Sequence, residues 1–301
     1  MKSNTIKGYL FALLATLSFS NVYIFSKAAL NQIHLTQFGI YWCAIGVILS
    51  LLFALKNNKL AQIKELTKKQ IRILLILGGL EILTTATFFI SINIIPDPAI
   101  TSFLGNMFPV MVALGGIIIL KEKLAWIEIM GGLLAIAGTF IISYSGGTSL
   151  KTFFIAGTGI VLVNAILATT ATLTVKVYVK EMSPELFNLN RYIWLFLFSF
   201  IIFFVYKQPF AIPAKALSNV GIGAFLEFIA ILTVYYSYRY IEASRSAIVQ
   251  SLKGIFVLIG AFLVFKTFPA PYQFMGGMIT VLGVLIMSLA QAGYFSPKEN
   301  R

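Results

Sequence analysis

Charged residues, cysteine and histidine are all scarce in this sequence. Only 11% of its 301 residues are charged and 59% are hydrophobic, whereas about 25% of the residues of an ordinary soluble domain are charged. This composition excludes a water-soluble globular protein and leaves no room for a large soluble catalytic domain. The single cysteine, Cys43, cannot form an intrachain disulfide, and the single histidine, His34, cannot build a histidine-based metal site. Zinc-binding, thiol-redox and disulfide-scaffold functions are excluded as well, so we expect no metal site.

Acidic residues are rarer than basic ones, with 10 Asp and Glu against 23 Lys and Arg, which gives a formal net charge of +13. A basic excess can indicate nucleic-acid binding. Here the basic residues form short clusters between apolar runs, which is the distribution found in membrane proteins. We therefore expect the chain to lie in a lipid bilayer and to bind no nucleic acid.

Apolar runs bounded by charges, prolines or polar turns give ten candidate membrane-spanning helices, each near the length of about 20 residues that a bilayer requires. The first run follows Lys2 and Lys7, as in a signal peptide. It is longer than a signal-peptide core of about 7 to 15 residues, and the next run follows almost at once, so we expect a retained first helix. The sequence thus predicts an all-α integral membrane protein. The predicted spans are residues 5–29, 35–55, 71–92, 98–119, 125–144, 152–175, 185–206, 217–238, 244–265 and 271–291.

Basic residues are distributed unevenly between the two sides of such a bundle. The side that carries the N-terminus collects 17 Lys and Arg, the other side collects 5, and Lys253 falls in the middle of a span. Cytoplasmic loops are the ones enriched in Lys and Arg. Because an even number of spans returns the chain to its starting side, we expect a multi-pass protein of the cytoplasmic membrane with both termini in the cytoplasm.

A weak internal repeat relates the two halves of the chain. The glycine-rich segment 131–138 recurs 145 residues later as 276–283. Two halves of five helices each are implied, and because five is odd the halves enter the membrane in opposite senses, which is the inverted repeat of secondary transporters. The predicted repeats are residues 1–147 and 148–301. Matches at offsets of 146 to 149 residues support them: Glu81 with Glu227, Gly8 with Gly157, and Lys27 with Lys176.

Residues 106–142 resemble the ten-helix, EamA-type branch of the drug/metabolite transporter superfamily. Pro109 inside the fourth span, the loop residue Glu122, Trp126 and the glycine-rich fifth helix follow the family's order and spacing. The segment from Gly8 to Lys27 is also similar to the opening of the family's first helix, and Ser183-Pro184-Glu185 with Arg191 is similar to the opening of its seventh.

The resemblance covers the whole chain, with two departures. Lys266-Thr267 stands where the second half usually has its loop glutamate, and Trp42 or Cys43 stands near a position where the first half commonly has an arginine. Relatives of this kind transport amino acids, other metabolites, nucleotide sugars or drugs. The resemblance therefore implies a transporter that needs no bound cofactor.

Polar side chains in the middle of a span are the candidates for substrate binding, because an inverted repeat places its substrate site near the middle of the membrane. Glu81, Glu227 and Lys253 each lie about halfway along a predicted helix. A charge left in hydrocarbon costs several kcal/mol, so each should face a cavity or a partner. Lys253 can pair with only one glutamate, in a pair that is either structural or functional. The other glutamate would then be protonated, bind a cation or face water, and its protonation would couple transport to protons.

Further polar residues share these helix faces. Ser246, Gln250 and Lys253 are spaced to lie on one face of the ninth span. Serine and threonine hydroxyls in membrane helices often bond to their own backbone or join helices, so they are weaker candidates than amides. We expect no catalytic residue. The predicted substrate-binding set is Asn21, Glu81, Thr85, Asn106, Asn164, Glu227, Tyr235, Gln250 and Lys253.

The sequence leaves three classes of function open. The first is a secondary transporter that moves a small metabolite by alternating access, with an amino acid or related compound as the best candidate and export preferred. The second is a lipid-linked carrier or flippase, which would favour a basic groove, whereas only Lys253 is basic at depth. The third is a membrane-embedded enzyme, but the spans contain no Ser-His, HExxH or paired-aspartate pattern, so we expect no enzymatic activity. The substrate, the coupling ion and the oligomeric state do not follow from the sequence.

Overall fold

The computed structural model describes residues 2–120, 125–145 and 154–291, and within these ranges the chain is almost entirely helical. Regular β-strands are absent from this part of the chain, which confirms the predicted all-α class. The helices are α1 (Lys2–Leu30), α2 (Leu35–Lys56), the 3-10 helix η1 (Leu60–Glu65), α3 (Lys68–Ile94), α4 (Pro98–Leu104), α5 (Met107–Leu120), α6 (Trp126–Ser143), α8 (Thr158–Tyr178), α9 (Pro184–Val205), α10 (Ala214–Tyr240), α11 (Ala243–Ser251), α12 (Lys253–Phe265) and α13 (Pro271–Gln291).

Among the described residues, eight helical stretches are long and apolar enough to cross a membrane, and one of them runs from α11 into α12. Two shorter apolar stretches, Pro98–Val112 and Pro271–Met287, fall at the predicted fourth and tenth spans. The chain is therefore a multi-pass membrane protein, as its composition indicates. The helices begin at ordinary capping signals: Thr67 and Gln70 form a capping box before α3, and Ser183 precedes Pro184 at the start of α9.

The predicted fourth and ninth spans are each broken into two helices. At the first break, the amide of Phe108 bonds to the carbonyl of Gly105, three residues back. Pro109 has no N–H to bond that carbonyl in the ordinary α-helical pattern, so the turn tightens and α4 ends. At the second break, bonds of the same type join Leu252 to Val249 and Ile255 to Leu252, without a proline.

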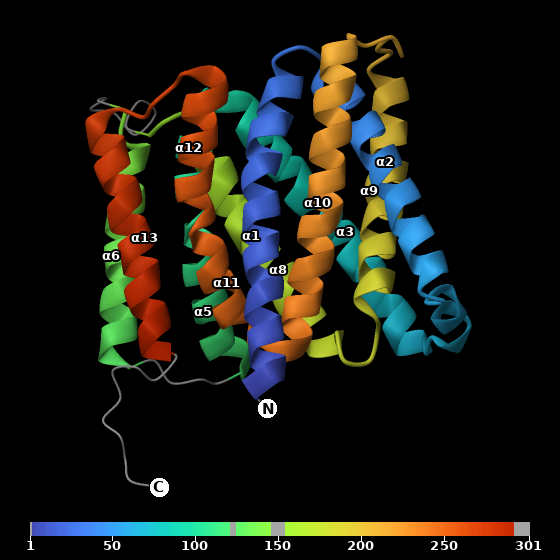
Figure 1. Cartoon of the computed structure of the whole chain (residues 1–301), viewed down its shortest axis with the longest axis horizontal. Helices are drawn as coiled ribbons and strands as arrows, with labels where there is room; N and C mark the ends of the chain where they lie inside the picture. Colours follow the sequence, from blue (N-terminus) through green and yellow to red (C-terminus); the bar gives the residue numbers. More distant parts are fainter. Residues whose placement is uncertain (1, 121–124, 146–153, 292–301) are drawn as a thin grey trace, which may run out of the picture.

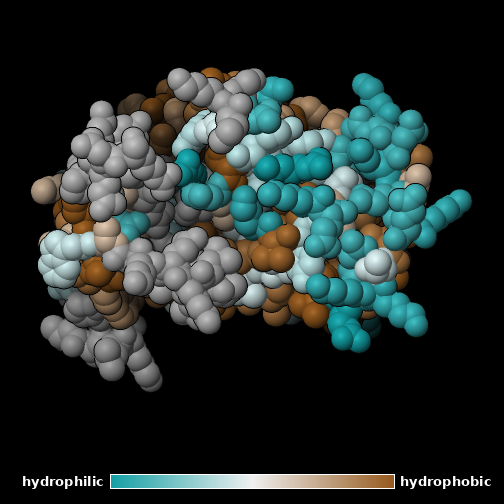
Figure 2. Space-filling model, turned by 90° about the horizontal axis from the view of Figure 1, so that it is seen from below, coloured by the Kyte–Doolittle hydropathy of each residue, from teal (hydrophilic) through white to brown (hydrophobic). Residues whose placement is uncertain are grey.

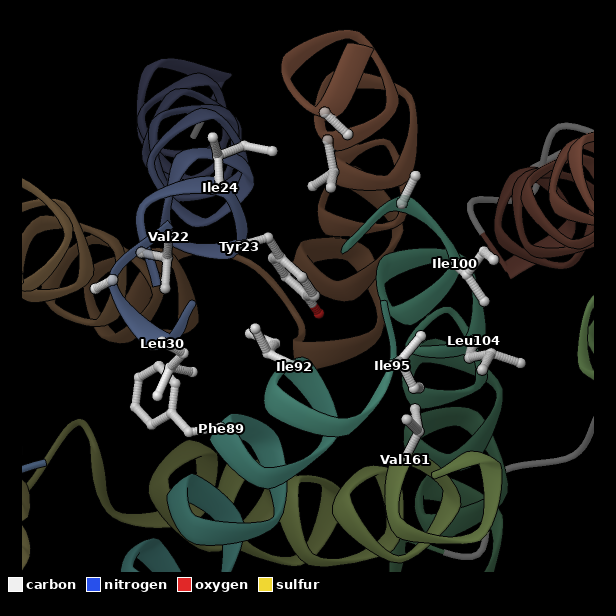
Figure 3. Packing of buried hydrophobic residues seen from close by; sticks show 14 of the residues in the cluster. Val22, Tyr23, Ile24, Leu30, Phe89, Ile92, Ile95, Ile100, Leu104 and Val161 are labelled. Atoms are coloured by element: carbon white, nitrogen blue, oxygen red, sulfur yellow. The ribbon is translucent and has the colours of Figure 1, made fainter. Parts of the chain in front are cut away.

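The helices form a broad bundle in which the two halves of the chain interleave (Figure 1). Helix α1 packs along α10 and α3 along α8, so each of these pairs takes one helix from each half. At one edge α6 packs on α13, and at the other α2 packs on α9. Figure 3 shows part of the apolar packing among α1, α3, α4 and α8, formed by Val22, Tyr23, Ile24, Leu30, Phe89, Ile92, Ile95, Ile100, Leu104 and Val161.

Glycines set the close approach of α6 and α13. A Cβ atom at Gly131 would lie 2.7 Å from the carbonyl oxygen of Gly283, and one at Gly138 would lie 2.6 Å from that of Gly276. Backbone therefore meets backbone along this edge, which van der Waals packing between membrane helices favours. The two glycine-rich segments that the repeat relates are thus packing seams.

Two lysines, the buried Lys27 and the half-buried Lys176, hold the C-terminal ends of α3 and α10. The Lys27 Nζ donates to the carbonyls of Ile92 at 2.8 Å, Asn93 at 3.3 Å and Ile95 at 2.9 Å. Likewise, the Lys176 Nζ donates to the carbonyls of Tyr238 at 2.7 Å and Ile241 at 2.6 Å. An ammonium group satisfies carbonyls that a helix end leaves unbonded and interacts well with the negative end of the helix dipole. The match between Lys27 and Lys176 in the sequence thus reflects one structural feature present twice.

Candidate functional site

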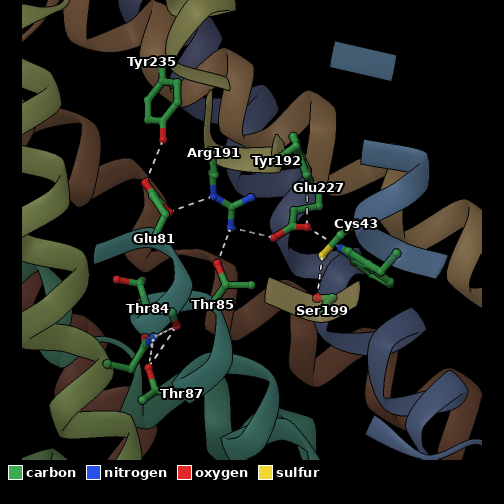
Figure 4. A network of polar contacts seen from close by, with 12 residues as sticks. Cys43, Glu81, Thr84, Thr85, Thr87, Arg191, Tyr192, Ser199, Glu227 and Tyr235 are labelled. Carbon is green, nitrogen blue, oxygen red and sulfur yellow. Dashed lines mark hydrogen bonds and ion pairs between the residues drawn. The ribbon is translucent and has the colours of Figure 1, made fainter. Parts of the chain in front are cut away.

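A buried arginine lies between the two glutamates that the repeat relates. Arg191 of α9 places its Nε 2.9 Å from the Glu81 Oε2 of α3 and its Nη2 3.1 Å from the Glu227 Oε1 of α10 (Figure 4). All three residues are at least nine-tenths buried. Buried charges in membrane helices need partners, and here one guanidinium serves two carboxylates.

Neutral donors complete the coordination of the carboxylates. Tyr235 donates to the Glu81 Oε1 at 3.0 Å, while Trp42 and Tyr192 both donate to the Glu227 Oε2. The Arg191 Nη2 also donates to the Thr85 hydroxyl at 2.9 Å, whereas its Nη1 has no partner among the described residues. We call Glu81, Thr85, Arg191, Glu227 and Trp42 the central cluster. Each carboxylate oxygen in it has a donor.

The central cluster follows the internal repeat, with one departure. Trp42 precedes Arg191 by 149 residues, the offset that relates Lys27 to Lys176. Arg191 in the second half bonds Glu81 in the first, and Trp42 in the first half bonds Glu227 in the second. Trp42 therefore supplies a neutral N–H where the repeat-related position supplies a cation. With both glutamates ionised, the cluster carries one more negative than positive charge.

A cavity of about 140 Å³ opens beside the central cluster. Glu81, Arg191 and Glu227 line it, and so does Lys253 at the start of α12. The Lys253 Nζ lies 6.0 Å from the centre of the Phe108 ring and has no hydrogen bond or ion pair within the described part of the chain. Other lining residues are Phe19, Tyr23, Thr84, Thr85, Phe88, Asn164, Tyr238 and Gln250.

Six of the nine predicted substrate-binding residues line this cavity: Glu81, Thr85, Asn164, Glu227, Gln250 and Lys253. Tyr235 lies behind Glu81 as its hydrogen-bond donor. Asn106 lies at the break between α4 and α5, fully buried, and neither amide atom has a partner among the described residues. Asn21 is exposed on the outer face of α1 and bonds to the Leu17 carbonyl at 3.0 Å, so it is not part of the site.

The expected ion pair between Lys253 and one glutamate is wrong, because Arg191 pairs with both. In the sequence, Arg191 stands near the start of its span and counts among the basic residues of the N-terminal side. It follows Pro184 by seven residues, which places it about 10 Å into the helix at a rise of about 1.5 Å per residue. An arginine at that depth in an apolar run is the signal that identifies it as a buried partner.

A second cavity, of about 590 Å³, lies among α2, α3 and α9. Its walls are mostly apolar and include Phe38, Phe89 and Phe198, and Trp42 and Thr85 of the central cluster also line it. Thr85 lines both cavities, so the central cluster stands at the boundary between them. No three His, Cys, Asp or Glu side chains gather anywhere in the described ranges.

The interleaved apolar helices define a multi-pass membrane protein with buried charges beside a central cavity. A sequence model of the EamA-like transporter family matches residues 6–144 and again residues 155–289, one match in each half. The chain belongs to this family, as its fourth and fifth predicted spans indicate. The loop residue Glu122, which contributes to the resemblance, lies outside the described residues.

Solved structures show the same fold. Twenty-eight chains of known structure match this one. One of them, described only as "Crystal structure of protein", is 14% identical in sequence, with a TM-score of 0.72 over 98% of this chain and 100% of the other. No curated protein matches the chain.

Proposed function

We propose that the protein is a secondary transporter that moves a small zwitterionic metabolite, with an amino acid as the best candidate, across the cytoplasmic membrane. The observation that carries this proposal is the presence of charged groups of both signs in one cavity. Two carboxylates share a single guanidinium, whereas Lys253 lines the same cavity over the Phe108 ring and forms no ion pair with another described residue. A zwitterion has one charged group for the carboxylates and one for Lys253.

The two ends of such a substrate would meet opposite charges. Its ammonium group would lie against Glu81 or Glu227 and offset the extra negative charge of the central cluster. Its carboxylate would lie against Lys253, and charge-assisted hydrogen bonds of this kind are stronger than neutral ones. Phe19, Phe88 and other aromatic side chains of the cavity would contact an apolar side chain, in the mixture of apolar walls and few polar groups that is typical of ligand sites.

Alternating access is supported by the arrangement of the two halves. The family model matches each half separately. The repeat relates α1 to α8 and α3 to α10, so the contact between α1 and α10 corresponds to the contact between α8 and α3. In transporters built from inverted repeats, broken helices lie at the substrate site. Here the α11–α12 break precedes Lys253, and Gly105 at the α4–α5 break lines the cavity. We infer ten spans in two inverted five-helix repeats, residues 1–147 and 148–301.

The orientation follows from the charges at the two ends of the bundle. Figure 2 views the end that carries the N-terminus, where hydrophilic residues cover much of the surface. By the positive-inside rule we expect this end to lie in the cytoplasm. We retain export as the expected direction of transport. Exposed basic residues there include Lys56, Lys59, Lys64, Lys68, Lys69, Arg72 and Lys180.

Counter-transport in proteoliposomes tests the function. Vesicles loaded with a mixture of amino acids should take up labelled amino acid faster than vesicles loaded with buffer, because an exchanging carrier uses the internal pool. Amines that lack a carboxylate and carboxylic acids that lack an amine should compete weakly. Equal competition by anionic metabolites would refute the zwitterion site, and uptake that does not depend on the internal amino acids would refute the exchanging carrier.

A further inference from the structure

A buried carboxylate outside the central cluster forms no ion pair with any described residue. Glu185 lies in the first turn of α9, directly after Ser183 and Pro184, and is only 3% exposed. Its Oε1 accepts a hydrogen bond from Tyr236 of α10, but its Oε2 has no partner among the described residues. None of the ion pairs in the described ranges includes Glu185. A carboxyl group is thus buried here, and one of its two oxygens accepts no hydrogen bond from the described residues.

A second unpartnered oxygen lies one turn further along the same helix. Asn188 is 1% exposed, and its Nδ2 donates to the Ser50 Oγ of α2 at 3.4 Å, which leaves its Oδ1 without a partner in the part of the chain that the structure describes. Residues three apart in a helix are neighbours on its surface. Glu185 and Asn188 therefore bring two free acceptors to the place where α2 and α10 both pack on α9. Buried acceptors are rarely left without a partner. One positive ion that contacts both oxygens would satisfy them.

The oxygens gathered here suit a small hard cation. A carboxylate, an amide carbonyl and two hydroxyls, from three helices, are the ligands that alkali and alkaline-earth ions prefer. The set has one formal negative charge, which balances a monovalent ion. A divalent ion would leave an excess positive charge beside the apolar cluster around Phe228 and at the positive end of the α9 dipole. We propose that Glu185, Asn188, Ser50 and Tyr236 form a sodium-binding site.

The site would link α2, α9 and α10 at the end of the bundle that carries the N-terminus (Figure 1). It shares no residue with the central cluster: Glu185 precedes Arg191 by six residues, or about 9 Å along the helix axis, and Asn188 lies one helical turn before Arg191. Sodium binding at this position goes beyond the proposed transport. It can be measured without substrate, so failure of either proposal leaves the other standing.

Thermal unfolding of the purified full-length protein in detergent, at constant pH and ionic strength, provides the test. Replacing choline chloride with sodium chloride should raise the unfolding temperature of the native protein in a saturable way, because an ion that binds only the folded state stabilises it. Glu185→Gln should abolish this response. Ser50→Ala, which removes a single hydroxyl, should raise the half-saturating sodium concentration by about tenfold.

Glu128→Gln is the matched control. Glu128 is also a buried glutamate in the first turn of a helix, but its Oε2 accepts the Ala125 N–H. This variant should keep the full sodium response. If Glu185→Gln responds to sodium as the native protein does, or if choline and sodium act alike on the native protein, the proposal is overturned. Should Glu185→Gln fail to fold, a native-like sodium dependence in Ser50→Ala overturns it. If protons alone stabilise the native protein, on lowering the pH from 8 to 6 without sodium, the sodium site is overturned in favour of a proton-binding site.

Discussion

Replacement of Arg191 by glutamine tests whether Arg191 stabilises the two buried glutamates of the central cluster. The substitution keeps a polar side chain but removes the cation that lies 2.9 Å from Glu81 and 3.1 Å from Glu227. Both carboxylates would stay buried, with only Tyr235, Trp42 and Tyr192 as donors. Removing one partner of a buried ion pair costs about 3 to 5 kcal/mol, because it leaves an uncompensated charge in a medium of low polarity. With two carboxylates stranded, we expect a loss at the upper end of that range.

The loss should be reversed by removing the stranded charges. In the triple variant Arg191→Gln, Glu81→Gln and Glu227→Gln, the same positions carry neutral side chains that can hydrogen-bond to one another. The cost of about 3 to 5 kcal/mol comes from an uncompensated buried charge, and the triple variant has no such charge at these positions. The triple variant should therefore be more stable than Arg191→Gln alone.

Thermal unfolding in detergent, followed by circular dichroism, measures both effects. At about 2 to 4 °C per kcal/mol, Arg191→Gln should lower the unfolding temperature by at least about 6 °C. The matched control is Arg245→Gln, because Arg245 forms a partly exposed ion pair with Glu242, and such pairs contribute only about 0 to 1 kcal/mol. An Arg191→Gln protein as stable as the native one, or a triple variant less stable than Arg191→Gln, would refute the assigned role of Arg191 as the shared partner of both glutamates.

Three further predictions concern the fold, the orientation and the coupling. Lys27→Met should destabilise the protein by about 1 to 3 kcal/mol, since the carbonyls at the end of α3 lose their donor, and Lys176→Met should act similarly at the end of α10. Native stability of both variants in thermal unfolding would contradict the proposal that these lysines hold the helix ends. A cysteine at Lys64, in a Cys43-free background, should react with an impermeant thiol reagent only after the cells are opened, and labelling of intact cells would reverse the topology. An imposed pH gradient should drive transport by the native protein, because a proton would offset the extra carboxylate when no ammonium group is bound, and Glu81→Gln or Glu227→Gln should weaken this dependence. A native protein that ignores the gradient, matched by both variants between pH 5 and 8, would exclude this coupling.

The positions of the helices and the equivalent depths of Glu81 and Glu227 could be predicted from the sequence. Apolar runs bounded by charges mark helices that the bilayer requires, and a repeat offset of 146 residues brings the two glutamates to equivalent places. Pro109 also marks the fourth helix as interrupted. The second interruption, before Lys253, has no proline and is visible only in the backbone hydrogen bonds.

The partners within the site could not be predicted, because pairing depends on the direction in which each helix faces. Lys253 and Asn21 both lie near the middle of a span, yet Lys253 faces the cavity beside Phe108 and Asn21 faces outward. Depth along a helix can be counted in the sequence, whereas rotation about its axis is set by packing against its neighbours. In the sequence, Trp42 stands out only as a departure from a family pattern. Its role as a neutral donor to Glu227 requires the packed structure.

Binding of a zwitterionic substrate's carboxylate by Lys253 is tested most directly by a comparison of two ligands. Competition against labelled amino acid uptake is measured in proteoliposomes with the amino acid and with its amide, which lacks the carboxylate. The native protein should prefer the amino acid by about tenfold or more, the equivalent of roughly 1.4 kcal/mol or one charge-assisted hydrogen bond. Lys253→Gln should fold normally and lose most of this preference. A Lys253→Gln protein that keeps the native preference for the amino acid over its amide would contradict the proposed role of Lys253.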